Sequence, residues 1–145
     1  MFKHILIATD GSPLSERAAL RAVHLAQTLS AQVTAIHVSD PFHVHSPKPS
    51  TDPNAAERYN RDCEKRAAAY LAVVGNAAGA AGVAFDSIHV SAQHASAEII
   101  AAGDDKGCDV ICMASHGRTG LAAVFLGSAA VEVLTQSSIP VLVWR

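Results

Sequence analysis

Two glycine-bearing turns near the carboxyl end of the chain have the composition of an anion-binding loop. The first reads ASHG over residues 114–117, and nine residues later Gly127 and Ser128 form the second. Gly117 follows an apolar, strand-like run and allows a left-handed or closely approaching backbone. Gly127 and Ser128 precede a helix-like segment, whose first N–H groups and positive dipole end attract phosphate. Three or four such donors predict a site for a polyphosphate.

Other chemical patterns in the chain are incomplete. The fingerprints GxxxxGK[ST] and GxGxxG are both absent, and either glycine turn alone predicts no more than a change of direction. His43 and His45 lie in a proline-rich segment without a set of cysteines or carboxylates, so we expect surface histidines there, not metal ligands. No Ser/His/Asp set and no pair of carboxylates converges on one site. The case for a binding site therefore rests on the combination of the two turns.

The segments that must position these turns alternate between strand-like and helix-like patterns. Apolar, β-branched runs predict buried parallel strands, and apolar residues spaced by three and four predict helices. This alternation implies an α/β domain with right-handed crossovers, in which ligands bind beyond the carboxyl ends of the strands. The expected strands are 2–9, 32–38, 83–91 (at an edge), 108–114 and 141–144, with helices from Ser12-Pro13, Asn54, Ser96 and Gly127-Ser128 and a long loop over 41–53.

The composition of the chain limits the classes of binding partner and the cellular compartment that we expect. The chain has 145 residues, 50 % of them hydrophobic and 17 % charged, with a net charge of −2, which favours a buried core and gives no attraction for nucleic acid. No apolar run approaches the ~18 residues of a membrane span, and no signal peptide is evident. Cys63, Cys108 and Cys112 suggest no disulfide framework, and strand alternation would bury the last two on one face as inert thiols. We expect a cytoplasmic protein.

The two turns, the ATDGS sequence after the first strand and the closing SIPVLVW resemble the universal stress protein family over the whole chain. Its nucleotide-binding motif is G-x2-G-x9-G-(S/T), and here Ala114, Gly117, Gly127 and Ser128 match the spacing and three of the four defined positions. The resemblance implies a single domain over 1–145. It also implies a Rossmann-like, open parallel five-stranded sheet of order 3-2-1-4-5, with helices on both faces.

The resemblance further implies an ATP site with Mg²⁺. Asp10, after Ala8 and Thr9, would contact the adenosine, although Asp10 is equally suited to a cap-like role before the first helix. The backbone at Val38 would meet the adenine. The other side of the ligand and its phosphates would be held by Met113, Ala114, His116, Gly117, Arg118, Gly127, Ser128 and Ala129, with no metal ligand set from the protein alone.

Ala114 stands where the motif has its first glycine. Its methyl group could crowd the ligand or exclude a backbone conformation that only glycine adopts easily, so we expect weakened, not abolished, binding. Two alternatives stay open: a family member that binds a protein partner without nucleotide, and a slow ATP hydrolase with His116 as base. The resemblance also implies a homodimer through the last strand, at Val141, Leu142 and Val143.

Overall fold

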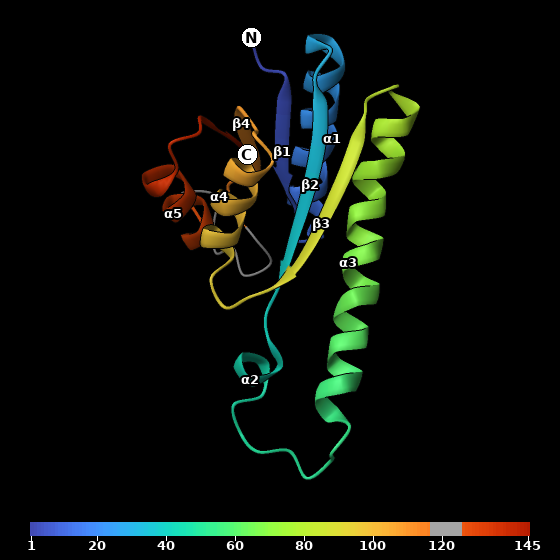
Figure 1. The fold of residues 1–145 in the computed structure, drawn as a ribbon, viewed down its shortest axis with the longest axis vertical. Helices are drawn as coiled ribbons and strands as arrows, with labels where there is room; N and C mark the ends of the chain where they lie inside the picture. The colour runs from blue at the N-terminus through green and yellow to red at the C-terminus, as the bar shows by residue number, and fades with distance from the viewer. Residues whose placement is uncertain (117–125) are drawn as a thin grey trace.

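A computed structural model describes residues 1–116 and 126–145 of the chain (Figure 1). In these two segments, strands and helices alternate as the sequence predicts. The elements are β1 (His4–Ala8), α1 (Pro13–Leu29), β2 (Gln32–Ser39), α2 (Phe42–His45), α3 (Ala55–Ala80), β3 (Phe85–Ser91), α4 (Ala95–Asp105), β4 (Val110–Ala114), α5 (Ser128–Gln136) and β5 (Val141–Trp144).

The strands of the described residues form one parallel sheet of order β3-β2-β1-β4-β5. The predicted fold class and strand order are therefore confirmed, including the edge position of β3. The order reverses direction between β1 and β4, which pair with Ile7 opposite Cys112. In a sheet of this kind, the crevice at the carboxyl ends of those two strands is where ligands bind.

Helices cover both faces of the sheet (Figure 1), and each face has its own core. Because successive strand residues point to opposite faces, Ile5 and Ile7 of β1 pack beneath α1 and α3, whereas Leu6 packs beneath α4 and α5. All three side chains are at most 1 % exposed. Two-sided burial explains why β1 reads as a continuous apolar run.

The start of α1 follows the predicted pattern. Ser12 is the N-cap residue and its hydroxyl accepts a hydrogen bond from the N–H of Ser15 at 3.2 Å. Pro13 occupies the first helical position, where its missing N–H is no loss and its fixed φ favours the helix. This cap fixes the direction in which the chain leaves β1.

Two local predictions were wrong. The expected loop over 41–53 contains the short helix α2, which is held by aromatic contacts from Phe42 and His45 to Tyr59 of α3. Ser96 does not cap α4, because that helix already begins at Ala95 and the Ser96 hydroxyl instead donates a hydrogen bond to a carboxylate of α5. In both cases a contact with a residue distant in the sequence determines the local structure, and the local sequence pattern does not reveal that contact.

Cys108 and Cys112 are buried, as predicted, but they lie in the cores on opposite faces of the sheet. The prediction of a shared face was wrong because β4 begins at Val110, so strand alternation does not reach Cys108. Burial raises the pKa of the Cys112 thiol to about 12. Burial, assisted by the neighbouring Asp109 carboxylate, raises the pKa of Cys108 to about 11.

We expect the free energy of unfolding to fall as the pH rises above about 9. A thiol of the unfolded chain ionises near its ordinary pKa of 9.0, whereas those of Cys108 and Cys112 ionise only near 11 and 12 in the folded protein. The unfolded state then releases protons that the folded state retains, which favours unfolding. Urea unfolding followed by circular dichroism between neutral and alkaline pH measures this slope. An equally steep slope in a Cys108→Ala, Cys112→Ala double variant would contradict the assignment.

No helix among the described residues is both long enough and apolar enough to cross a membrane.

Candidate functional site

The turn that follows β1 is held by a dense set of local hydrogen bonds. The Thr9 and Ser15 hydroxyls lie 2.7 Å apart, and the Ser15 oxygen also accepts the N–H of Asp10 at 3.1 Å. The N–H of Gly11 donates to the Thr9 hydroxyl oxygen at 3.3 Å. These bonds tie the end of β1 to the first turn of α1, so the turn is a defined structure before any ligand is considered.

Asp10 has a structural role within this turn. One of its carboxylate oxygens accepts the N–H of Ser12 at 2.9 Å, which is the pattern of an Asx turn. The N-cap residue of α1 is Ser12, so Asp10 is not the cap itself but supports it from two residues earlier in the chain. Asp10 is half-buried at the carboxyl end of β1.

Two side chains that the sequence patterns did not single out pack against the same turn. The ring nitrogen Nδ1 of His37 on β2 donates to the carbonyl of Thr9 at 2.8 Å, and His37 is only 7 % exposed. Tyr70 of α3 lies edge-on to His37, with 5.1 Å between ring centroids, and covers Gly11. Gly11 has a φ of +75°, so both its backbone and its neighbour favour glycine.

The end of β4 lies beside β1 and is joined to the other half of the motif. Ala114 pairs with Trp144 of β5 as an ordinary strand residue with no positive φ, so the backbone does not require glycine there. Ser115 is 1 % exposed and its N–H donates to the Trp144 carbonyl at 2.8 Å. Its own carbonyl accepts the N–H of Gly127 at 2.7 Å. Ser115, just after β4, and Gly127, just before α5, therefore lie side by side.

The helix α5 starts immediately after this junction. Gly127 is its N-cap residue, with an extended backbone and no side chain that could cap the helix. Ser128 is the first helical residue, so its hydroxyl does not cap the helix. The first turn contains no acidic residue. The first N–H groups of α5 are thus suited to an external anion.

The structure places the predicted residues at the carboxyl edge of the sheet with different degrees of exposure. Ser128 is exposed, while Ala8, Thr9, Met113 and Ala114 are buried and shape the site without offering much surface. Gly117 and Arg118 lie outside the described residues. Asp10, Val38, His116, Gly127 and Ala129 are half-buried.

His116 supports a ligand at this edge. Its Nδ1 lies 2.9 Å from the Ser115 hydroxyl, which fixes the ring, and its Nε2 is buried with no hydrogen-bond partner among the described residues. Those residues contain no group of three His, Cys, Asp or Glu side chains that could hold a metal. Mg²⁺ fits such a site only as it usually binds nucleotides, through phosphate oxygens, water and at most one or two carboxylates.

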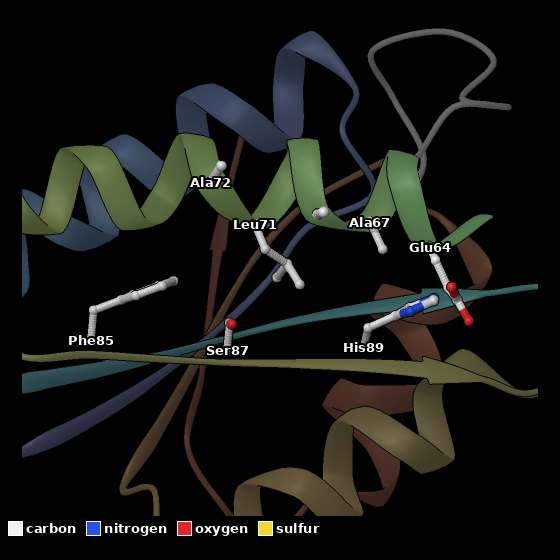
Figure 2. Close-up of a pocket in the computed structure, with 8 residues that line it drawn as sticks. Glu64, Ala67, Leu71, Ala72, Phe85, Ser87 and His89 are labelled. Atoms are coloured by element: carbon white, nitrogen blue, oxygen red, sulfur yellow. The ribbon is translucent and has the colours of Figure 1, made fainter. Parts of the chain in front are cut away.

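A hollow lies away from the predicted site, between α3 and the edge strand β3 (Figure 2). It has a volume of about 480 Å³ and is lined mainly by small and apolar side chains. Figure 2 shows Phe85 at one end and Glu64 with His89 at the other. His89 also stacks on His37, with 5.9 Å between ring centroids, and its Nε2 lies 2.8 Å from the Ser39 hydroxyl. Through His89, the hollow thus adjoins the His37 and Tyr70 side chains that pack against the Thr9 turn.

Comparison with known sequences gives consistent matches over the full chain. Residues 1–145 match the model of the Universal stress protein family. Universal stress protein YxiE of Bacillus subtilis is 30 % identical over 149 residues, covering 100 % of both chains. Universal stress protein MJ0531 of Methanocaldococcus jannaschii is 33 % identical over 145 residues, covering 99 % of this chain and 82 % of that protein.

Solved structures agree with this assignment. Protein MJ0577 of Methanocaldococcus jannaschii superposes with a TM-score of 0.83 at 30 % identity, covering 99 % of this chain and 95 % of that one. A universal stress protein in complex with cAMP superposes with a TM-score of 0.70 at 21 % identity, covering 99 % and 97 %. Family match, sequence identity and strand order lead to one conclusion: the chain belongs to the universal stress protein family.

Proposed function

We propose that this protein binds ATP, together with Mg²⁺, and acts in the cytoplasm as a sensor or adaptor in a stress response. The observation that carries the proposal is the 2.7 Å hydrogen bond from the Gly127 N–H to the Ser115 carbonyl. It brings the two halves of the A-x2-G-x9-GS motif together at the carboxyl edge of the sheet, next to the Thr9 turn. In the proposed site, the N-terminus of α5, the His116 imidazole, whose Nε2 has no hydrogen-bond partner among the described residues, and the half-buried Asp10 carboxylate face the same ligand.

Each part of the proposed site has a distinct task. The Asp10 carboxylate accepts hydrogen bonds from the ribose, and the backbone at Val38 meets the adenine. Met113, Ala114 and His116 form the opposite wall. The phosphates lie at the start of α5, where N–H groups and the helix dipole stabilise negative charge. The residues that contact the phosphates are Gly127, Ser128 and Ala129, with Gly117 and Arg118 as further predicted contacts. Mg²⁺ neutralises the phosphates when bound.

Proteins of the same fold support an adenine nucleotide as the ligand class. One universal stress protein has been solved with cAMP, and that of Archaeoglobus fulgidus with dAMP, the latter at a TM-score of 0.62 and 14 % identity. Both ligands share an adenine base and a phosphate. The extended donor set of the two turns here favours a polyphosphate over a monophosphate.

Nucleotide retained through purification tests the proposal against the alternative of a partner-binding member without nucleotide. The protein is purified without added nucleotide and denatured, and the released small molecules are identified by mass spectrometry. An adenine nucleotide near one equivalent supports the proposal. If none is retained and none binds on addition, the alternative is correct.

We expect Ala114→Gly to raise ATP affinity several-fold and to lower stability by about 0.5–1 kcal/mol. Ala114 is 6 % exposed in a regular strand, so its methyl group acts on the ligand by bulk and not through backbone strain. Glycine removes the bulk but adds chain entropy to the unfolded state. Calorimetric titration and urea unfolding measure the two effects separately. Unchanged affinity would show that the methyl group does not matter to the site.

A homodimer through β5 is also part of the proposal. This strand is at the edge of the sheet and its four apolar residues, 141–144, are all half-buried. The helix α5, which packs on β5, exposes Val131 and Leu134 by 42 % and 40 %. An apolar edge with apolar neighbours favours pairing with a second copy.

Slow hydrolysis of the bound ATP is a second candidate, favoured by the fixed ring of His116 beside the proposed phosphates. A general base must lie within hydrogen-bond reach of the attacking water. Mg²⁺-dependent phosphate release that is lost in His116→Ala, with ATP still bound, would support it. Release at the same rate in that variant would exclude His116 as the base.

A further inference from the structure

The turn after β1 is shaped by contacts from α3 as well as by its own hydrogen bonds. A Cβ atom at Gly11 would lie 2.3 Å from two ring carbons of Tyr70, far inside any real contact distance. The Tyr70 ring therefore occupies the space in which a side chain of the turn would lie. Any shift of α3 at this point changes the room available to the turn.

His37 provides a second connection between the same elements. Its Nδ1 holds the carbonyl of Thr9 at 2.8 Å, and its ring lies edge-on to Tyr70 at an interplanar angle of 75°. His37 is only 7 % exposed. Loss of its ring would therefore leave the buried Thr9 carbonyl without a hydrogen-bond donor, which is costly. The packed rings of His37 and Tyr70 thus fix Thr9 and Gly11, the two residues that flank Asp10 in the chain.

We propose that Tyr70 and His37 are positioning residues through which α3 sets the conformation of the Thr9–Ser12 turn, so that nucleotide binding and the packing of α3 control one another. The ligand half of this inference rests on the proposed function. Coupling between two sites is reciprocal in binding free energy. A nucleotide held by Asp10 would stabilise α3, and a partner that moves α3 would change nucleotide affinity. The helix α3 is then the element that reports the occupancy of the site.

The geometry explains why α3 suits this role. Figure 1 shows that α3 extends beyond the carboxyl edge of the sheet, where α2 packs against it. Tyr59, in this extending part of α3, donates a hydrogen bond to the Asp40 carbonyl at 2.9 Å. One helix therefore contacts both the Thr9 turn, through Tyr70, and the α2 segment, through Tyr59. A change at the turn is transmitted along a rigid helix to a surface far from the core.

The first test needs no ligand. Amide resonances of Asp10 and Gly11 are compared in wild type, Tyr70→Phe, Tyr70→Ala and Tyr59→Ala. The last is a matched control, since it is the same substitution on the same helix. We expect Tyr70→Ala to shift both resonances, and Tyr70→Phe, which keeps the ring, to shift them less. Shifts no larger in Tyr70→Ala than in Tyr59→Ala would overturn the proposal.

A double-mutant cycle then measures the contact itself. Gly11→Ala should raise the unfolding equilibrium constant at least about tenfold more in the wild-type background than in Tyr70→Ala, because only the former contains the clash. Equal effects in the two backgrounds would contradict the packing argument. Should Tyr70→Ala fail to fold, Tyr70→Leu removes the ring with less loss of apolar volume.

Hydrogen exchange with and without Mg²⁺-ATP tests the reciprocal effect on the wild-type protein. We expect added protection in the Thr9–Ser12 turn and in the part of α3 around Tyr70. Protection in the turn but not in α3 would overturn this inference while the proposed function stands. If ATP protects neither and does not bind, the proposed function fails, and the ligand-free shifts still decide whether α3 sets the turn.

Discussion

Gly127→Asp is expected to lower ATP affinity by at least about tenfold while leaving the fold as stable as wild type or slightly more so. Gly127 is the N-cap residue of α5, with an extended backbone (φ −64°, ψ 155°) that aspartate adopts without strain. A carboxylate there accepts the first N–H groups of the helix and interacts favourably with its dipole, by about 0.3–1 kcal/mol. The same carboxylate occupies and repels the position of the phosphates.

Gly127→Asn is the control for this result, because it caps the helix equally well without the negative charge. Calorimetric titration with Mg²⁺-ATP and urea unfolding are measured on all three proteins. The expected order of affinity is wild type, then asparagine, then aspartate, with stability in no case lower than wild type. An aspartate variant that binds ATP as tightly as wild type would place the phosphates elsewhere.

Val143→Pro is expected to convert a dimer into a folded monomer. The carbonyls of Pro140 and Trp144 accept hydrogen bonds from the N–H groups of Ile111 in β4 and of Ser115 just after it. Strand alternation then directs the backbone groups of Leu142 toward β4 and those of Val143 toward the free edge. Proline at Val143 removes an outward N–H and is tolerated on an edge strand. Pairing with a second copy is blocked while the sheet itself stays intact.

Sedimentation velocity and circular dichroism of Val143→Pro measure this outcome. Leu142→Pro is the matched control, since it removes a hydrogen bond inside the sheet and should destabilise the fold by about 3 kcal/mol or more. A wild-type protein that is monomeric at micromolar concentration would remove the dimer from the proposal. A Val143→Pro variant that remains dimeric would move the interface away from β5.

The sequence was sufficient to locate the strands and most of the helices because its signals were local and repeated. Apolar runs and the Ser12-Pro13 helix start both depend only on neighbours in the chain. The spacing from Ala114 to Ser128 likewise located both halves of the candidate site. The resemblance to a family then supplied the order of the strands.

Features that depend on contacts between distant residues could not be read in this way. The short helix α2 forms around Tyr59, and Ser96 bonds to Glu132, 36 residues away. His37 and Tyr70 look like ordinary strand and helix residues until the fold brings them to Thr9 and Gly11. A buried histidine at the carboxyl end of a strand was the one signal that could have drawn attention to His37.

Calorimetric titration of the wild-type protein with ATP, in the presence and absence of Mg²⁺, tests the central claim most directly. AMP and ADP are titrated in parallel. The proposed site predicts one ATP per chain, with affinity rising from AMP to ADP to ATP and rising further with Mg²⁺. The absence of any binding heat for ATP, confirmed by unchanged thermal unfolding at millimolar nucleotide, would contradict it.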